Sequence, residues 1–120
     1  MADTEISNVF VVSEDTIRDK IYYFRGQKVM LASDLARIYG YTTKTFNQQV
    51  SNNIDKFDED FRFQLTDEEF ADLRSKELTS SWGGTRYNPY VFTESGVYML
   101  MTVLKGELAT RQSKALILNM

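Results

Sequence analysis

The sequence contains neither cysteine nor histidine among its 120 residues. Without cysteine the chain can form neither disulfides nor thiolate metal sites, a composition typical of proteins in a reducing cytoplasm. The usual imidazole base and thiolate nucleophile of enzymes are both missing. The acidic runs at 58–60 and 67–69 could in principle bind Mg²⁺, but a turn and the first turn of a helix explain them better. We therefore expect no enzyme activity, cofactor, metal or small-molecule substrate.

Long apolar segments are also missing. No run of 18 or more apolar residues predicts a membrane span, and no charged and then apolar leader predicts a signal peptide. We therefore expect a cytoplasmic protein with no membrane partner. Apolar residues nevertheless make up 42% of the chain, which is enough for one compact core in a chain of this length.

Two short helices joined by a tight turn are predicted between Leu31 and Phe57. Gly40 suits the left-handed residue that ends a helix, and Thr42 or Thr43 can cap the next one. Together they form the pattern of a helix-turn-helix. The apolar face of the first helix is expected to contain Leu31, Leu35, Ile38 and Tyr39, and that of the second Phe46, Val50, Ile54 and Phe57.

The opposite face of the second helix is rich in amides and hydroxyls. It presents Lys44, Thr45, Gln48, Ser51 and Asn52, where a solvated helix usually shows Glu and Lys. Such groups can donate and accept hydrogen bonds at base edges in the major groove of DNA. The same face could equally be solvated surface, or make polar contacts with a neighbouring element.

The charges are unevenly distributed along the chain, whose formal net charge is −3. Residues 20–56, which include the predicted helix-turn-helix, hold six Lys and Arg against two Asp, whereas residues 57–77 hold eight acids against three bases. Because phosphate contacts need local positive charge, the first segment is the better candidate for DNA. Its six bases are Lys20, Arg25, Lys28, Arg37, Lys44 and Lys56.

Other elements follow from period and capping signals. Phe61, Phe63 and Leu65 alternate with polar residues as in a half-buried strand, and Thr66 with Glu69 forms a capping box. The remaining predictions are a leader over 1–20 with an apolar run at 9–12, a hairpin over 21–30 turning at Arg25-Gly26-Gln27, a helix over 67–77, a strand over 89–92 with Pro89 at its start or edge, a helix capped by Thr93 or Ser95, and a last helix over 107–120.

The blocks RGQKVML, LARIYG, KTFNQQVSNNIDKF, DFRFQLT and RYNPYVFTESGV occur in this order. Over about residues 21–118 the chain closely resembles the ORF-six-N domain of phage and bacterial proteins, a relative of the KilA-N and Bro-N domains of antirepressors. The resemblance implies a small DNA-binding α+β fold in a bacterial or phage-infected cell. Residues 21–120 would form this domain, and a variable effector domain that often follows it would be missing.

We therefore expect a winged-helix-like α+β domain with an antiparallel sheet, which binds double-stranded DNA sequence-specifically in transcriptional regulation. The alternative is a protein-interaction module that binds a repressor or another regulator. Gln48 would make a bidentate contact to adenine, and Arg86 would act as a wing residue in a Gly-rich loop. The predicted DNA contacts are Thr43, Lys44, Thr45, Gln48, Asn52, Lys56, Arg37 and Arg86.

Apolar groups surround most of the last predicted helix. A helix that is apolar on most sides must bury more than one face, and a second copy of the chain could cover the outer one. This pattern predicts a homodimer whose interface contains Leu108, Leu116, Ile117 and Met120.

Overall fold

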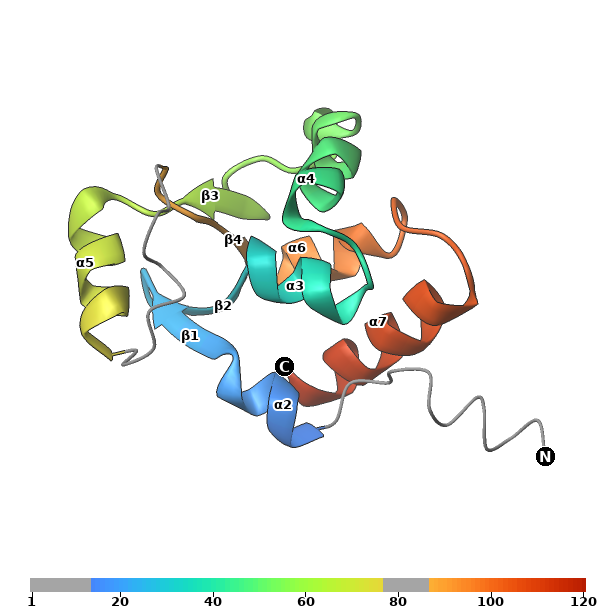
Figure 1. The fold of residues 1–120 in the computed structure, drawn as a ribbon, viewed down its shortest axis with the longest axis horizontal. Coiled ribbons are helices and arrows are strands. Elements are labelled where there is room, and N and C mark those ends of the chain that lie inside the picture. Colours follow the sequence, from blue (N-terminus) through green and yellow to red (C-terminus); the bar gives the residue numbers. More distant parts are fainter. Residues whose placement is uncertain (1–13, 77–86) are drawn as a thin grey trace.

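The computed structural model describes residues 14–76 and 87–120, which form six α-helices, one 3-10 helix and one four-stranded antiparallel sheet (Figure 1). The mixed α+β fold predicted from the sequence is thus confirmed. In chain order the elements are α2 (Glu14–Asp19), β1 (Ile21–Phe24), β2 (Gln27–Leu31), α3 (Ala32–Ile38), α4 (Thr43–Ser51), the 3-10 helix η1 (Ile54–Lys56), β3 (Arg62–Gln64), α5 (Asp67–Lys76), β4 (Tyr90–Thr93), α6 (Glu94–Leu100) and α7 (Glu107–Asn119).

The strand order in the sheet is β1-β2-β4-β3, so the last strand in the sequence lies between β2 and β3. Its Val91 pairs with Leu31 on one side and with Phe63 on the other. The pairing of β1 with β2 is the predicted hairpin. Its turn is one residue shorter than expected, because Gln27 pairs with Phe24.

A two-residue turn closes this hairpin. Arg25 and Gly26 both have positive φ, 55° and 74°, as in the type I′ turns that match the twist of antiparallel strands. Glycine adopts such a conformation at little cost. The strained Arg25 makes long-range contacts, because its Nε and one terminal nitrogen donate to the Glu69 carboxylate on α5 at 3.0 and 3.1 Å.

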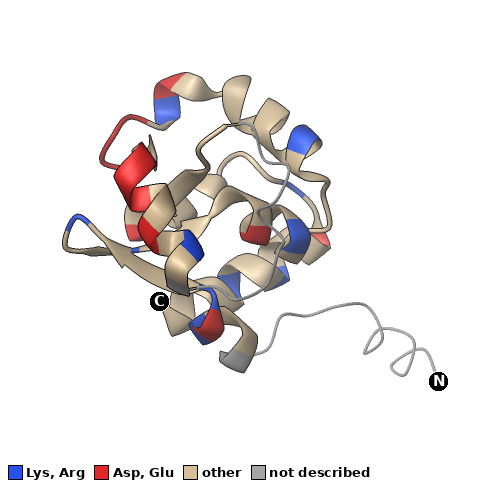
Figure 2. Cartoon of the chain, turned by 60° about the vertical axis from the view of Figure 1, so that its left-hand side comes forward, with Lys and Arg blue, Asp and Glu red and all other residues tan. Residues whose placement is uncertain are grey.

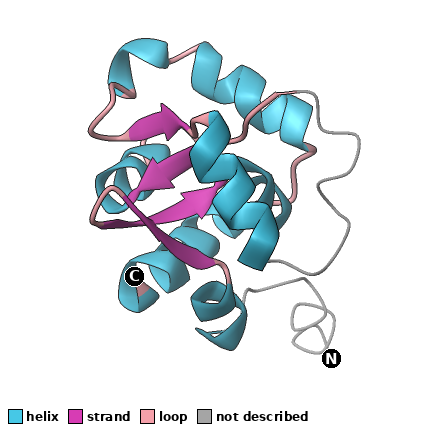
Figure 3. Cartoon of the chain, turned by 90° about the vertical axis from the view of Figure 1, so that its left-hand side faces the viewer, coloured by secondary structure: helices cyan, strands magenta, loops and turns pink. Residues whose placement is uncertain are grey.

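Both faces of the sheet are covered by helices, as Figure 3 shows. Alternating residues of each strand point to opposite faces, so the central strands supply two apolar clusters. One cluster joins the sheet to α3, α4, α6 and α7 and includes Met30, Phe46, Phe92, Val97 and Leu116. The other joins it to α5 and includes Val29, Leu31, Phe63, Leu73 and Val91.

Side-chain caps fix the starts of three helices. Thr42 accepts from the Thr45 amide at 3.1 Å, and Thr93 accepts from the Gly96 amide at 3.1 Å. The predicted capping box is confirmed, because Thr66 and Glu69 exchange hydrogen bonds of 2.8 and 3.2 Å. Of the alternatives that the sequence leaves open, the structure has Thr42 rather than Thr43, and Thr93 rather than Ser95, as the capping residue.

The second predicted helix is shorter than expected. α4 ends at Ser51, and Ile54 lies in η1 with 52% of its surface exposed, so its assignment to the apolar face was wrong. Asn53 favours the end of the helix, because asparagine readily bonds nearby backbone groups. Here Asn53 Nδ2 donates to the Gln49 carbonyl at 3.0 Å. Phe57 returns to the core, where it is buried.

Part of the predicted leader belongs to the fold. Ile17 of α2 is fully buried in the larger apolar cluster, because α2 packs against α7. The apolar run at 9–12 lies outside the described residues. Within the described ranges, no helix is long and apolar enough to cross a membrane.

The predicted dimer surface on α7 needs correction. Leu116 is fully buried in the core of its own chain and cannot face a second copy in this fold. Since α7 packs against both α6 and α2, one chain can cover more than one side of this helix. Leu108, Ile117 and Met120 are each partly covered, and Leu118 is 83% exposed.

Candidate nucleic-acid interface

The chain turns from α3 to α4 within the four residues 39–42. Gly40 has φ 80°, and its amide donates to the Arg37 carbonyl at 3.1 Å, while the Tyr41 amide donates to the Ala36 carbonyl at 2.8 Å. This pair of bonds around a left-handed glycine is the Schellman motif, which ends a helix sharply. The predicted role of Gly40 is therefore confirmed.

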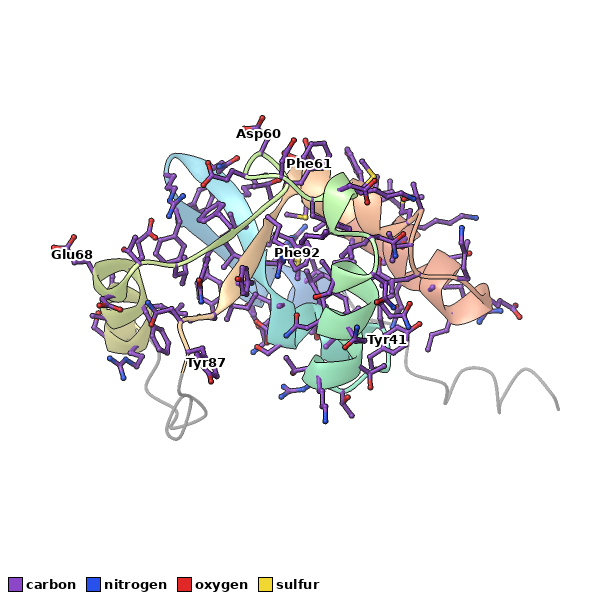
Figure 4. The ribbon with its side chains drawn as sticks, turned by 90° about the horizontal axis from the view of Figure 1, so that it is seen from above. Tyr41, Asp60, Phe61, Glu68, Tyr87 and Phe92 are labelled. Carbon is purple, nitrogen blue, oxygen red and sulfur yellow. The ribbon has the colours of Figure 1, made fainter. Side chains whose placement is uncertain are left out.

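One face of α4 anchors it to the sheet. Phe46 and Val50 are fully buried, and the Phe46 ring meets the Phe92 ring edge-on with centroids 5.6 Å apart. Phe92 lies on the central strand β4, and Figure 4 shows it in the middle of the molecule beneath α4. Aromatic pairs in this geometry add about 0.5–1.5 kcal/mol to the burial of their apolar area. The anchored face fixes which side of α4 faces solvent.

The outer face of α4 is exposed as predicted. All five of its candidate DNA contacts are on the surface, and α4 itself contains no acidic residue. Gln48 and Asn52, one turn apart, share a hydrogen bond of 3.0 Å from Nε2 to Oδ1. The exposed candidates are Thr43, Lys44, Thr45, Gln48 and Asn52.

The basic residues of the 20–56 segment are divided between different parts of the fold. Arg37 is exposed in the last turn of α3, and Lys56 is half-buried in η1. By contrast, Arg25 is held by Glu69, and Lys28 donates to the Met120 carbonyl. The basic residues in α4 and in the elements that flank it are therefore Lys44, Arg37 and Lys56. Arg86 lies outside the described residues.

Acidic residues gather away from the start of α4. Figure 2 shows Asp and Glu along one side of the molecule, at the 58–60 loop and the first turn of α5. In Figure 4, Asp60 and Glu68 project outward at a distance from Tyr41, which lies in the turn before α4. The negative charge predicted for this region thus lies to the side of the candidate DNA face.

The ion pair between Arg25 and Glu69 joins the hairpin turn to α5. Its hydrogen bonds raise the pKa of Arg25 and lower the pKa of the Glu69 carboxyl, so both groups stay charged. The Arg25 guanidinium also lies 4.0 Å from the centroid of the Phe63 ring. A second guanidinium, that of Arg62, stacks over Tyr90 at 3.8 Å, and burial lowers its pKa.

Sequence reasoning missed the polar contacts between α7 and the α3–α4 turn. The Tyr39 hydroxyl lies 2.5 Å from Ser113 Oγ, and Gln112 Nε2 donates to the Ile38 carbonyl at 2.8 Å. Burial raises the pKa of the Tyr39 phenol, which therefore keeps its proton. The apolar residues of α7 gave the only signal in that segment, and nothing in the sequence marked its glutamine or serine.

A family model describes the region that holds α3, the turn and α4. The model of the ORF6N domain matches residues 19–103. The chain belongs to the ORF6N family. The resemblance to the ORF-six-N domain is thereby confirmed, although the ORF6N match ends at Val103, before α7 begins, whereas the predicted similarity extended to about residue 118. Comparisons with curated proteins and with solved structures gave no significant match.

Proposed function

We propose that this ORF6N domain binds double-stranded DNA without catalysis and reads its sequence through the exposed face of α4, in transcriptional regulation of the antirepressor type. One observation carries the proposal: α4 turns a polar face without acids to solvent while Phe46 and Val50 fix it to the sheet. In this proposal α3, the turn and α4 form a helix-turn-helix, with α4 as the recognition helix.

The start of α4 favours an anion. The first turn of a helix has amides without intrahelical partners and the positive end of the helix dipole, where acidic residues are usually stabilising. α4 has no acid there and instead carries the exposed Lys44. A DNA phosphate would bind these amides together with Lys44 and the Thr43 hydroxyl. The bases would then lie opposite Gln48 and Asn52, farther along the helix.

Winged-helix-like binding is part of the same proposal. The predicted wing residue, Arg86, would reach a neighbouring phosphate or the minor groove. Because this residue is outside the described part of the chain, the wing rests on the sequence alone. The sheet that would support it is described, since β4 begins at Tyr90.

Selection from random duplex DNA tests the proposal directly. We expect the wild-type chain to enrich a defined motif, and Gln48→Ala to lose the preference at one or two base positions of it. The matched control is Arg74→Gln, which removes an exposed charge on α5 without touching α4. Flat enrichment with the wild-type chain would contradict the proposal.

The alternative function is the binding of a repressor or another regulator protein. Tyr98 and Met101 favour it, because both are more than 40% exposed and lie three residues apart, at α6 and its C-cap. The two functions predict different results in the same selection. Flat enrichment would favour the protein-binding module, whereas a motif that depends on Gln48 would favour DNA reading.

A further inference from the structure

The helix α7 lies outside the family match, yet it contacts the turn that precedes α4. The match ends at Val103, and α7 spans Glu107–Asn119. Three side chains of α7 reach residues 38–40, at the junction of α3 and the turn. They are Leu108, Gln112 and Ser113, which recur at the four- and five-residue spacing of one helical face.

Gln112 makes the most specific of these contacts. Its side chain is fully buried, and its Nε2 donates to the Ile38 carbonyl at 2.8 Å. The last carbonyls of a helix have no partner within the helix, so this bond satisfies one of them at the end of α3. A buried amide is unfavourable unless it is hydrogen-bonded. The position of Gln112 is therefore tied to the position of the turn.

The other two contacts join α7 to Tyr39 and Gly40, the first two residues of the turn. The hydroxyls of Tyr39 and Ser113 lie 2.5 Å apart, and both residues are less than 5% exposed. Leu108 Cδ2 lies 3.5 Å from the point that a Cβ would occupy at Gly40. The backbone of α3 thus passes into the turn against a surface made by α7.

We infer that Gln112 and Ser113 of α7 are positioning residues for α4, and that the functional unit of this protein extends through α7. Only residues 39–42 separate α3 from α4, so a shift of Ile38 or Tyr39 is passed on to the start of α4. Recognition groups must be held to about 0.5 Å for productive contacts. The consequence for DNA rests on the proposed function, whereas the structural coupling between α7 and α4 does not.

Hydrogen exchange without DNA tests the structural part. Gln112→Met keeps the approximate size of the side chain but leaves the Ile38 carbonyl without its donor. We expect amides of the turn and α4 to exchange about tenfold faster in this variant, while amides of α5 change little. The matched control is Leu73→Ala, since Leu73 is fully buried in the α5 cluster. It should show the opposite pattern, with α5 affected most.

DNA binding tests the functional part at a temperature where every variant is folded. Gln112→Met and Ser113→Ala should weaken binding to the selected motif about tenfold and binding to random DNA much less. Leu73→Ala should leave the ratio of the two affinities unchanged. Should Gln112→Met fail to fold, Ser113→Ala and Tyr39→Phe remove the smaller contact from either side, and their effects should not add.

Two results would overturn the inference. One is amide hydrogen exchange that becomes faster by the same factor in α4 and in α5 of the Gln112→Met variant, because α7 would then only stabilise the whole fold. The other is an unchanged affinity ratio in the Gln112 and Ser113 variants of a chain that selects a motif. If the wild-type chain selects no motif while exchange in α4 responds as expected, the proposed DNA function fails and the coupling between α7 and α4 stands.

Discussion

At the scale of single residues, Gln48 and Asn52 are the side chains that the proposed function places opposite the bases. Their shared bond occupies one hydrogen of the Gln48 amide and leaves its Oε1 free to accept. Gln48→Ala and Asn52→Ala should each weaken binding to the best site by about 1–3 kcal/mol. Because each change also releases the other side chain, the double variant should lose less than the sum.

Affinities of the four chains for the selected site and for random DNA measure this coupling. Arg74→Gln is the control, since Arg74 is exposed on α5 and is not part of the candidate face of α4. Additive losses would mean that the two amides act independently. An unchanged base preference in both single variants would remove them from the reading surface.

Gly96, near the start of α6, packs directly against the backbone of Phe61. A Cβ added there would lie 1.9 Å from the Phe61 carbonyl oxygen, a backbone atom that cannot move aside alone. Overpacking of this kind typically destabilises by about 1–3 kcal/mol, so Gly96→Ala should lower the urea midpoint clearly. The neighbouring exposed Ser95→Ala should not. Equal midpoints for Gly96→Ala and the wild-type chain would contradict the close approach of α6 to the loop before β3.

At the scale of elements, the proposed DNA binding by a chain of net negative charge requires a local cationic surface around α4. Lys44→Ala and Lys56→Ala should weaken binding to all sequences, and each should reduce the slope of log affinity against log salt by about one. The same result is expected for Arg86→Ala if it contacts phosphate. Arg74→Gln on α5 should leave the slope unchanged. Unchanged slopes in all of the α4-side variants would place the phosphate contacts elsewhere.

The ion pair between Arg25 in the hairpin turn and Glu69 in α5 should stabilise the fold less at acidic pH than at neutral pH. The pKa of Glu69 is lower in the folded than in the unfolded chain, so its contribution is present above the ordinary carboxyl pKa and is lost as pH falls through the lowered value. Because the Arg25 side chain is 40% exposed, we expect the ion pair between Arg25 and Glu69 to contribute only about 0.2–1 kcal/mol to the free energy of unfolding.

Urea unfolding of Glu69→Gln between pH 7 and pH 3 checks this prediction. Glutamine keeps the capping box but removes the charge, so the variant should be less stable at pH 7 and approach the wild-type chain near pH 3. Glu68→Gln, an exposed neighbour in the same helical turn, is the control. A constant difference between variant and wild type across this range would exclude the ion pair as the source.

The elements were predictable from sequence where local chemistry decides them. Gly40, Thr42 and the Thr66 capping box act within a few residues, and the structure confirms each of them. The contacts that the sequence did not predict join distant segments. Nothing near Gln112 indicates that the Ile38 carbonyl will meet it, because the two are 74 residues apart. Likewise, the candidate face of α4 was predictable from its period, whereas its support by α7 was not.

At the scale of the whole molecule, the arrangement of α7 bears on assembly. The sequence predicts a homodimer because the apolar groups surround most of α7, so that a second copy would cover the outer side of this helix. The structure weakens that reason, since α7 packs against α6 and α2 and only Leu118 remains largely exposed. A stable interface usually covers about 800 Å² on each partner, far more than one leucine provides.

We therefore expect sedimentation at micromolar concentration to give the mass of one chain, 13.9 kDa. Leu118→Asp should leave both mass and stability unchanged, whereas Leu116→Asp should unfold the chain by placing a charge in the core. A single chain presents one α4, so the motif selected from random DNA should be asymmetric and shorter than one helical turn. Two results together would support the homodimer instead. One is a doubled mass that Leu118→Asp or Ile117→Asp abolishes, and the other is a palindromic motif whose halves lie about 34 Å apart. In that case α7 would form the dimer interface in addition to positioning α4.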